Sequence, residues 1–409
     1  MTVTVGALQT PAAGPSGTAR EVFLAALRLG LTSFGGPIAH LGYFERTYVQ
    51  RLRWLSTEQY GSVVSLCQLL PGPTSSQVGF LIGLQRAGWF GALAAWAGFT
   101  LPSAALMYAF AVLAPTFPGP LMQAVLHGLM LTAVVVVAQA VWSMARTLAP
   151  DLPRRTIATG ALALLIFQRN GETQIATLAI AAIVGSVVCR SATPSATQLS
   201  VRPDTRAGWI ALAIFCIVLA GLPWLAFYFA HNSIALATQF YQAGAMVFGG
   251  GHVVLPLLQQ SLIPDHWISQ ERFLAGYGFA QAMPGPLFTF VAYLGAACAP
   301  AGRAVYWAIT ALIAIFLPGL LLAVAGLSLL SRIANNNVAS GAMRGVNAAV
   351  VGLLAAALYD PVWKSAVLSF ADVAVVLMAF ALLQRSKAAP ILIAALCVLA
   401  GIAERVLAH

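Results

Sequence analysis

The 409-residue chain has very little charge. Only 8% of its residues are Asp, Glu, Lys or Arg, whereas 60% are hydrophobic, and its mean hydropathy is +0.86. A soluble globular protein carries about 25% charged residues, so this chain lacks the side chains that would cover a folded surface in water. The composition therefore excludes the soluble globular class and predicts an all-α polytopic membrane protein.

The sequence also lacks the usual signatures of catalytic and metal centres. Its five cysteines form no CxxC pair, and neither HExxH, GxSxG nor any run with metal-ligand spacing occurs. We therefore predict no cofactor, no metal and no catalytic residues. A membrane-embedded enzyme is the least favoured alternative.

Positive charge outweighs negative charge, with 21 Lys and Arg against 11 Asp and Glu. Most of these residues lie between apolar runs, which favours cytoplasmic loops and contact with the anionic headgroups of a lipid bilayer over a nucleic acid partner. Residues 1–20 are small and polar and have no charged segment before an apolar stretch, so we interpret them as a disordered tail.

Two apolar runs are too short to cross a bilayer, which requires about 20 residues. Residues 57–70 would form about 21 Å of helix and residues 74–84 about 16 Å. Pro71-Gly72-Pro73 lies between them. We predict two half-helices that meet inside the membrane, either as a re-entrant hairpin or as one broken helix.

The chain repeats itself at a nearly constant sequence offset, which is 213 for the Pro-Gly-Pro motif (284 − 71) and 214 for the Gly-Gly motif (248 − 34). We interpret residues 21–189 and 234–409 as two copies of one unit, joined in 190–233 by a polar linker and one extra transmembrane helix. The matched pairs are Trp54 with Trp267, Gln68 with Gln281, Pro71-Gly72-Pro73 with Pro284-Gly285-Pro286, and Phe34-Gly35-Gly36 with Phe248-Gly249-Gly250.

Charge predicts that the second copy is inverted. The segment 37–56 carries Arg46, Arg51 and Arg53, whereas its counterpart 251–270 has neither Lys nor Arg. Positive loops stay in the cytoplasm, so the two segments should face opposite sides. Inverted repeats are typical of transporters, whose substrate site lies near the middle of the membrane between the repeats.

The Pro-Gly-Pro motif suits an anion site. Pro71 ends one helix, Gly72 permits unusual backbone angles, and Pro73 starts the next helix without needing an N–H. Free N–H groups at a helix N-terminus attract anions. A merely structural kink is the alternative, because Pro and Gly are common in membrane helices. Polar side chains follow the motif directly, namely Thr74, Ser75, Ser76 and Gln77.

Arg28 lies in the middle of the apolar run 21–35. Burying an arginine at that depth costs about 2.5–3.5 kcal/mol on insertion scales. A dianionic ligand would offset this cost, although Glu21, Glu45 or snorkelling of the side chain towards the headgroups would do so as well.

Other ionisable residues have structural explanations that we favour. Glu58 and Glu271 each follow a serine that can cap a helix. His40 and His252 flank the Gly-Gly motifs and suit structural hydrogen bonding. Asp372, inside an apolar run, has no assigned role.

Gly35-Gly36, Val49, Trp54 and Pro71-Gly72-Pro73 stand in that order, with twelve, four and sixteen intervening positions. This pattern resembles the chromate ion transporter family in its long, two-domain form, and the resemblance covers nearly the whole chain. It implies a multi-pass protein of the bacterial inner membrane that exports chromate and confers chromate resistance. The resemblance further implies transport driven by the membrane potential or proton gradient, with sulfate as a competing dianion.

The second copy departs from the first after its Pro-Gly-Pro motif, where Leu287-Phe288-Thr289 replaces Thr74-Ser75-Ser76. We therefore expect the first tip to contact substrate and the second to act as a gate or scaffold. Transport of sulfate or another oxyanion stays open as an alternative, because sequence does not separate dianions of similar shape. A homodimer also stays open.

Overall fold

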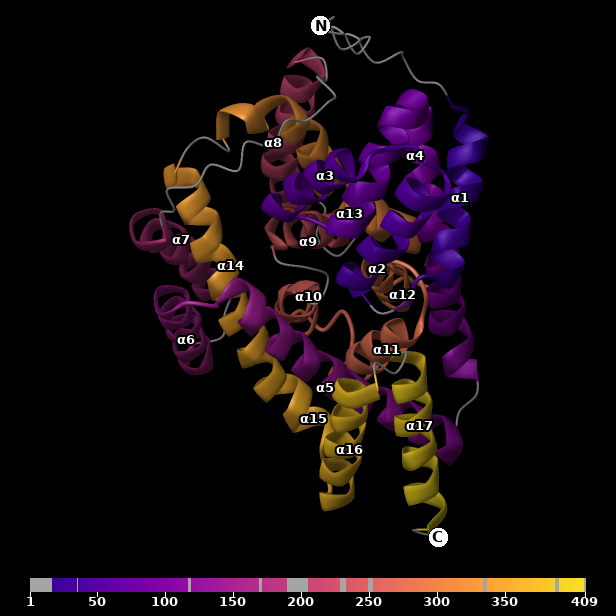
Figure 1. Cartoon of the computed structure of the whole chain (residues 1–409). Helices are drawn as coiled ribbons and strands as arrows, with labels where there is room; N and C mark the ends of the chain where they lie inside the picture. Colours follow the sequence, from indigo (N-terminus) through magenta and orange to yellow (C-terminus); the bar gives the residue numbers. More distant parts are fainter. Residues whose placement is uncertain are drawn as a thin grey trace, which may run out of the picture.

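The computed structural model describes residues 17–34, 36–116, 119–168, 171–189, 205–228, 233–248, 253–333, 337–386 and 390–407. Most of the predicted tail and linker, and Gly35, Gly249 and Gly250, lie outside these ranges. Across the described ranges the regular structure is helical, without strands (Figure 1), and five helices are long and apolar enough to span a membrane. The predicted all-α polytopic membrane class is confirmed.

The first half of the chain contains elements up to residue 188. They are α1 (Ala19–Thr32), α2 (Gly36–Phe44), η1 (Glu45–Arg51), α3 (Thr57–Leu69), α4 (Thr74–Leu113), η2 (Ala114–Thr116), α5 (Pro120–Leu148), α6 (Leu152–Phe167) and α7 (Gly171–Val188).

The second half follows α8 (Thr205–Tyr228). Its elements are α9 (Ser233–Met246), α10 (Val254–Leu262), α11 (Gln270–Ala282), η4 (Leu287–Thr289), α12 (Phe290–Ala297), α13 (Ala304–Ile333), α14 (Asn337–Ala357), η5 (Leu358–Trp363), α15 (Lys364–Ala366), α16 (Phe370–Ser386) and α17 (Pro390–Leu407).

Helix α4 is two helices that turn back on each other. The backbone leaves helical geometry at Ala87 and Gly88, and Gly88 adopts a φ of 64° that favours glycine. Gly83 and Gly91 then approach so closely that each lies against the other's carbonyl group. The part of α4 before the turn is therefore a short helix, and the part after it is long enough to span.

Helix α3 and the first part of α4 form a re-entrant hairpin. The guanidinium of Arg86, near the end of that part, lies 5.2 Å from the ring centre of Trp54, which precedes α3. The two ends of the hairpin therefore lie close together, with Pro71-Gly72-Pro73 at its far tip. Of the two alternatives that the sequence left open, the structure has the hairpin.

Helices α11 and α12 form a second hairpin with Pro284-Gly285-Pro286 at its tip. The Tyr293 hydroxyl on α12 donates to the carbonyl of Arg272, in the first turn of α11, at 2.9 Å. Trp267 before α11 contacts Trp307 after α12, with ring centres 5.8 Å apart. Both Pro-Gly-Pro motifs are thus carried to the far ends of folded-back helices.

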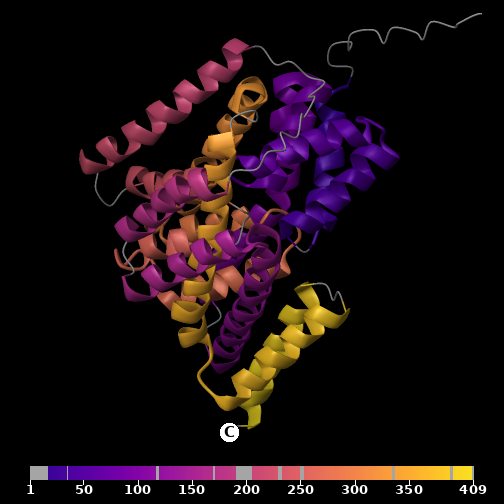
Figure 2. The same ribbon diagram turned by 60° about the vertical axis from the view of Figure 1, so that its left-hand side comes forward.

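The longer helices surround these hairpins. Helix α1 packs along α4, α13 contacts α9 and α12, and α5 contacts both α11 and α17. Helix α8 runs along the outer edge (Figure 2). Only 6% of its most apolar 18-residue stretch is buried, as expected for a helix that faces lipid. Helices α16 and α17 form the lower end of the molecule in Figure 1.

Candidate functional site

The tip of each re-entrant hairpin is hydrogen-bonded to the other half of the chain. The N–H of Gly72 donates to the carbonyl of Val247 at 2.7 Å, and the N–H of Gly285 donates to the carbonyl of Ser33 at 2.8 Å. Val247 and Ser33 directly precede the two Phe-Gly-Gly motifs. Each Pro-Gly-Pro tip is therefore joined to the segment that leads into the opposite Gly-Gly motif.

The first tip packs without spare room. Gly72 is buried with a φ of 120°, and a Cβ atom there would lie 2.7 Å from the Cα of Gly319 on α13. The Gln77 side-chain amide donates to the carbonyls of Pro71 at 2.8 Å and Gly319 at 2.9 Å. Gln77 thus clamps the tip to α13, while Gly72 permits the close approach.

Polar side chains are buried beside this tip. Ser75, Ser76 and Gln77 are at most 4% exposed at the start of α4. His40 from α2 is 1% exposed, and its Nδ1 lies 3.3 Å from the Ser75 hydroxyl. The His40 ring also meets Phe99 edge to face, with centroids 5.4 Å apart. His40 therefore connects the start of α4 to its second part.

Several of these buried polar atoms have no hydrogen-bond partner among the described residues. A buried donor or acceptor without a partner costs about 1–3 kcal/mol, so such atoms are uncommon in a finished core. Some of them lie on the segments from α1 to α4, where Ser76 and Gln77 at the start of α4 are free to bind a polar ligand; others lie on α5, α7, α10 and α14. Those on the segments from α1 to α4 include Ser33 Oγ, Ser76 Oγ, Gln77 Oε1 and Thr100 Oγ1. The His40 imidazole, by contrast, contacts the Ser75 hydroxyl and interacts with the Ser33 backbone.

The backbone at the start of α4 adds to this polarity. The N–H of Gln77 bonds to the Pro73 carbonyl at 2.9 Å, which begins the helical ladder. The preceding N–H groups of Thr74, Ser75 and Ser76 have no carbonyl available within the helix. Together with the helix dipole they form a partly positive end suited to an anion.

The second tip is apolar instead. Leu287 and Phe288 are buried, and Phe288 contacts Phe316 with ring centres 5.8 Å apart. The Thr289 hydroxyl donates to the carbonyl of Pro286 at 2.8 Å and is therefore used within its own turn. Near this tip Gln281 is half-buried, and its side chain interacts with the Tyr277 hydroxyl.

Two residues from the sequence-based set do not join this cluster. The side chain of Arg28 is exposed on α1, and that of Gln68 is exposed on α3. The proposed role of Arg28 as a positive charge for the ligand therefore has no support in the geometry. The side chains buried beside the first tip are uncharged hydroxyls, amides and one imidazole.

The remaining motif residues hold the ends of the hairpins. The Trp54 ring stacks on that of Tyr48 with centroids 5.1 Å apart, and the backbone N–H of Trp54 donates to the Tyr48 carbonyl at 2.8 Å. Val49, in η1, packs partly buried against the core. The Ser56 hydroxyl donates to Glu58 at 2.7 Å, and this bond lowers the pKa of that carboxyl, as expected for a residue at a helix start.

The sequence patterns did not place Ser33, His40 or Thr100 among the site residues. Each sits in or beside a strongly apolar segment, next to a helix break or a proline. Isolated polar residues near such breaks are the signal that would have found them, because irregular backbone at membrane depth is tolerated where it lines a cavity.

Comparison with known proteins gives one consistent family. The chromate transporter family matches residues 20–186 and again residues 234–402. The chain is 29% identical to a probable chromate transport protein of Synechococcus elongatus over 81% of each chain. It is 25% identical to the chromate transport protein of Pseudomonas aeruginosa, over 86% of this chain and 83% of that one.

A third relative, the chromate transport protein of Cupriavidus metallidurans, is 25% identical over 100% of this chain and 98% of its own length. No solved structure matches the chain. The relatives are named as transport proteins and not as enzymes, in agreement with the composition and the membrane helices. The chain belongs to the chromate transporter family.

Proposed function

We propose that this protein exports chromate across the bacterial inner membrane, and that the buried polar cluster beside the first Pro-Gly-Pro tip binds the anion. The observation that carries the proposal is the set of unpartnered polar atoms at the start of α4. The names of the relatives support chromate as the substrate.

A dianion leaving water must find replacement hydrogen bonds. Hydroxyl and backbone N–H donors supply them, and hydrogen bonds to a charged partner contribute about 1.5–3 kcal/mol each. Neutral donors have an advantage for a carrier, because a fixed arginine would leave an unpaired charge in the membrane once the substrate departed. Sulfate offers the same shape and charge, so this chemistry also supports sulfate as a competitor.

The proposed mechanism is alternating access by two inverted copies. Three observations support the duplication. The family matches the chain twice. The Gly72–Val247 hydrogen bond has a counterpart in the Gly285–Ser33 bond. The two donors are 213 positions apart in sequence (285 − 72), and the two acceptors are 214 positions apart (247 − 33). Gly88 and Gly302 share a positive φ and the same offset of 214 (302 − 88). If the copies exchange conformations, each opens the site to one side of the membrane.

The inverted arrangement predicts that two exposed positions face opposite sides of the membrane. Gln50→Cys lies in the arginine-rich segment and Asp265→Cys in its counterpart, and both side chains are exposed. In a background without native cysteines, an impermeant maleimide added to intact cells should label residue 265 and spare residue 50. Everted vesicles should reverse the pattern. Labelling of both positions from one side would contradict the inverted copies.

Transport itself is tested in everted membrane vesicles, where export from the cytoplasm becomes uptake. Energised vesicles that contain the protein should accumulate radiolabelled chromate, and excess sulfate should reduce the accumulation. Dissipating the membrane potential and the proton gradient should abolish it. Vesicles with inserted protein that accumulate sulfate but no chromate would instead establish a sulfate transporter.

A further inference from the structure

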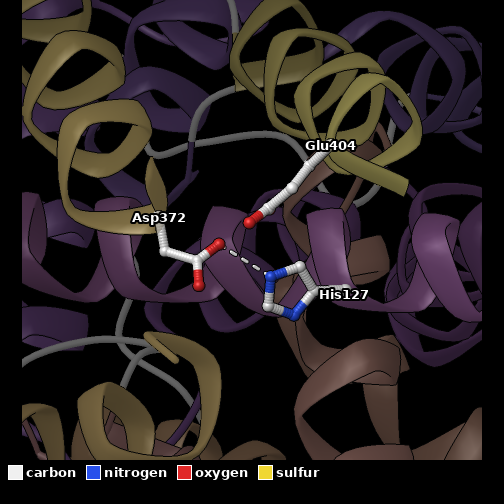
Figure 3. Close-up of side chains that lie close together, drawn as sticks. All are labelled: His127, Asp372 and Glu404. Carbon is white, nitrogen blue, oxygen red and sulfur yellow. Dashed lines mark hydrogen bonds and ion pairs between the residues drawn. The ribbon is translucent and has the colours of Figure 1, made fainter. Parts of the chain in front are cut away.

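Away from the tips, three ionisable side chains from three helices point toward one another (Figure 3). They are His127 on α5, Asp372 on α16 and Glu404 on α17. One ligand atom of each residue lies within 4.8 Å of the other two, and His127 Nε2 lies 2.7 Å from Asp372 Oδ1. Residues 245 positions apart in sequence thus form one compact cluster.

Both carboxylates are held in place by further hydrogen bonds. Asp372 Oδ2 accepts from the backbone N–H groups of Leu368 and Ser369 at 2.9 Å each, which leaves Oδ1 directed at His127. The Ser369 hydroxyl donates to Glu404 Oε1 at 3.1 Å. The reciprocal bonds between Ser369 and Asp372 cap the start of α16, and they also fix the carboxylate in one orientation, as the outer hydrogen bonds of metal ligands do.

The charge of the cluster is not balanced by the side chains that the structure describes. Asp372 is 1% exposed, and none of the described lysines or arginines forms an ion pair with it or with Glu404. Even with His127 protonated, two carboxylates leave a net negative charge. Asp372 is compensated by His127 and by two backbone N–H groups, whereas the more exposed Glu404 has only the Ser369 hydroxyl as a partner among the described residues. A divalent cation with a neutral imidazole would bring the cluster to zero charge.

We propose that His127, Asp372 and Glu404 bind a divalent transition-metal ion of the zinc class. Imidazole nitrogen with two carboxylate oxygens suits zinc and similar ions, whereas magnesium and calcium prefer oxygen ligands alone. Bonds of about 2.0–2.2 Å in a tetrahedron place ligand atoms about 3.4 Å apart, which small side-chain rotations can reach. Water would complete the coordination.

The ion would join three helices that the sequence leaves independent. Helix α5 already packs closely on α17, where Gly128 faces Cys397 and Val398 and leaves no room for a side chain. Helix α16 contacts both. A metal bound at their meeting point would fix the lower end of the molecule in Figure 1. It is distinct from the proposed chromate site and does not depend on it.

The test uses the purified full-length protein, treated with chelator and then titrated with Zn²⁺ or Co²⁺. We expect one ion per chain by mass spectrometry, a tetrahedral cobalt absorption band, and a melting temperature that rises with metal. Glu404→Gln and His127→Gln should weaken binding more than about 100-fold, because loss of a ligand exceeds the 10–100-fold typical of an outer-shell change.

The matched control is His266→Asn, which removes an exposed histidine with a φ of 58° that asparagine tolerates. It should bind metal as the unaltered protein does. The proposal is overturned if the unaltered protein retains no ion, or if Glu404→Gln binds as tightly as His266→Asn. A melting temperature that responds to pH but not to metal would identify a proton-sharing ion pair instead.

Discussion

Gly72→Leu is expected to abolish chromate transport by a protein that still inserts in the membrane. A side chain at this position meets Gly319 at 2.7 Å and Gln77 at 2.9 Å. The φ of 120° is also unfavourable for any L-residue. The tip must therefore withdraw from α13, which breaks the Gln77 clamp and displaces the start of α4. Radiolabelled chromate uptake in everted vesicles, corrected for the amount of inserted protein, measures the loss.

Gly61→Leu is the matched control for this prediction. Gly61 lies on the same hairpin, is exposed, and has open space within 4 Å of the place that a Cβ atom would occupy. It should transport normally. Retained transport by Gly72→Leu would show that the first tip need not approach α13, and the assignment of the site to this tip would then be wrong.

The double change Ser75→Ala/Ser76→Ala is expected to weaken chromate binding by about 100-fold to 10,000-fold. Two donors to a charged ligand contribute about 1.5–3 kcal/mol each. Folding should change little, because the Ser76 hydroxyl has no partner among the described residues and Ser75 has the 3.3 Å contact to His40. Chromate affinity by calorimetry and the melting temperature without ligand separate the two effects.

Two comparison variants sharpen this result. Ser261→Ala removes a hydroxyl that donates to the Leu257 carbonyl within α10 and should bind chromate normally. Leu287→Ala/Phe288→Ala, at the second tip, should lower the melting temperature by opening a cavity while affecting chromate affinity less. Equal loss of affinity from both tips would contradict the asymmetric assignment, and unchanged affinity in the serine variant would exclude these hydroxyls as ligands.

Composition and run length were enough to predict the class of the protein. With 8% charged residues the chain has no alternative to a lipid environment, and the confirmed helical architecture follows because only paired backbone groups are tolerated there. The shortness of residues 57–70 and 74–84 likewise required half-helices around Pro71-Gly72-Pro73. These properties follow from local composition and from the fixed rise of a helix per residue, so the sequence is enough to predict them.

The lengths of the apolar runs did not predict the direction of the second half-helix. Whether the chain continues across the membrane or turns back depends on contacts such as that of Arg86 with Trp54, which lie on opposite sides of the Pro-Gly-Pro motif in the sequence. Arg28 is a different case. It shares one face of α1 with Glu21 and Thr32, and the inward packing of Val22, Ala26 and Leu29 on another face leaves it exposed.

Tertiary structure alone brings together the polar residues beside the first tip and the cluster of His127, Asp372 and Glu404. His40 looked like a structural residue until folding placed it against Ser75, and His127 showed no sequence relation to Asp372 or Glu404. Helices can be predicted from local sequence patterns, because each hydrogen bond within a helix joins groups only one turn apart. Sites assembled from separate helices depend on which helix faces meet, and that is fixed by packing across the whole chain.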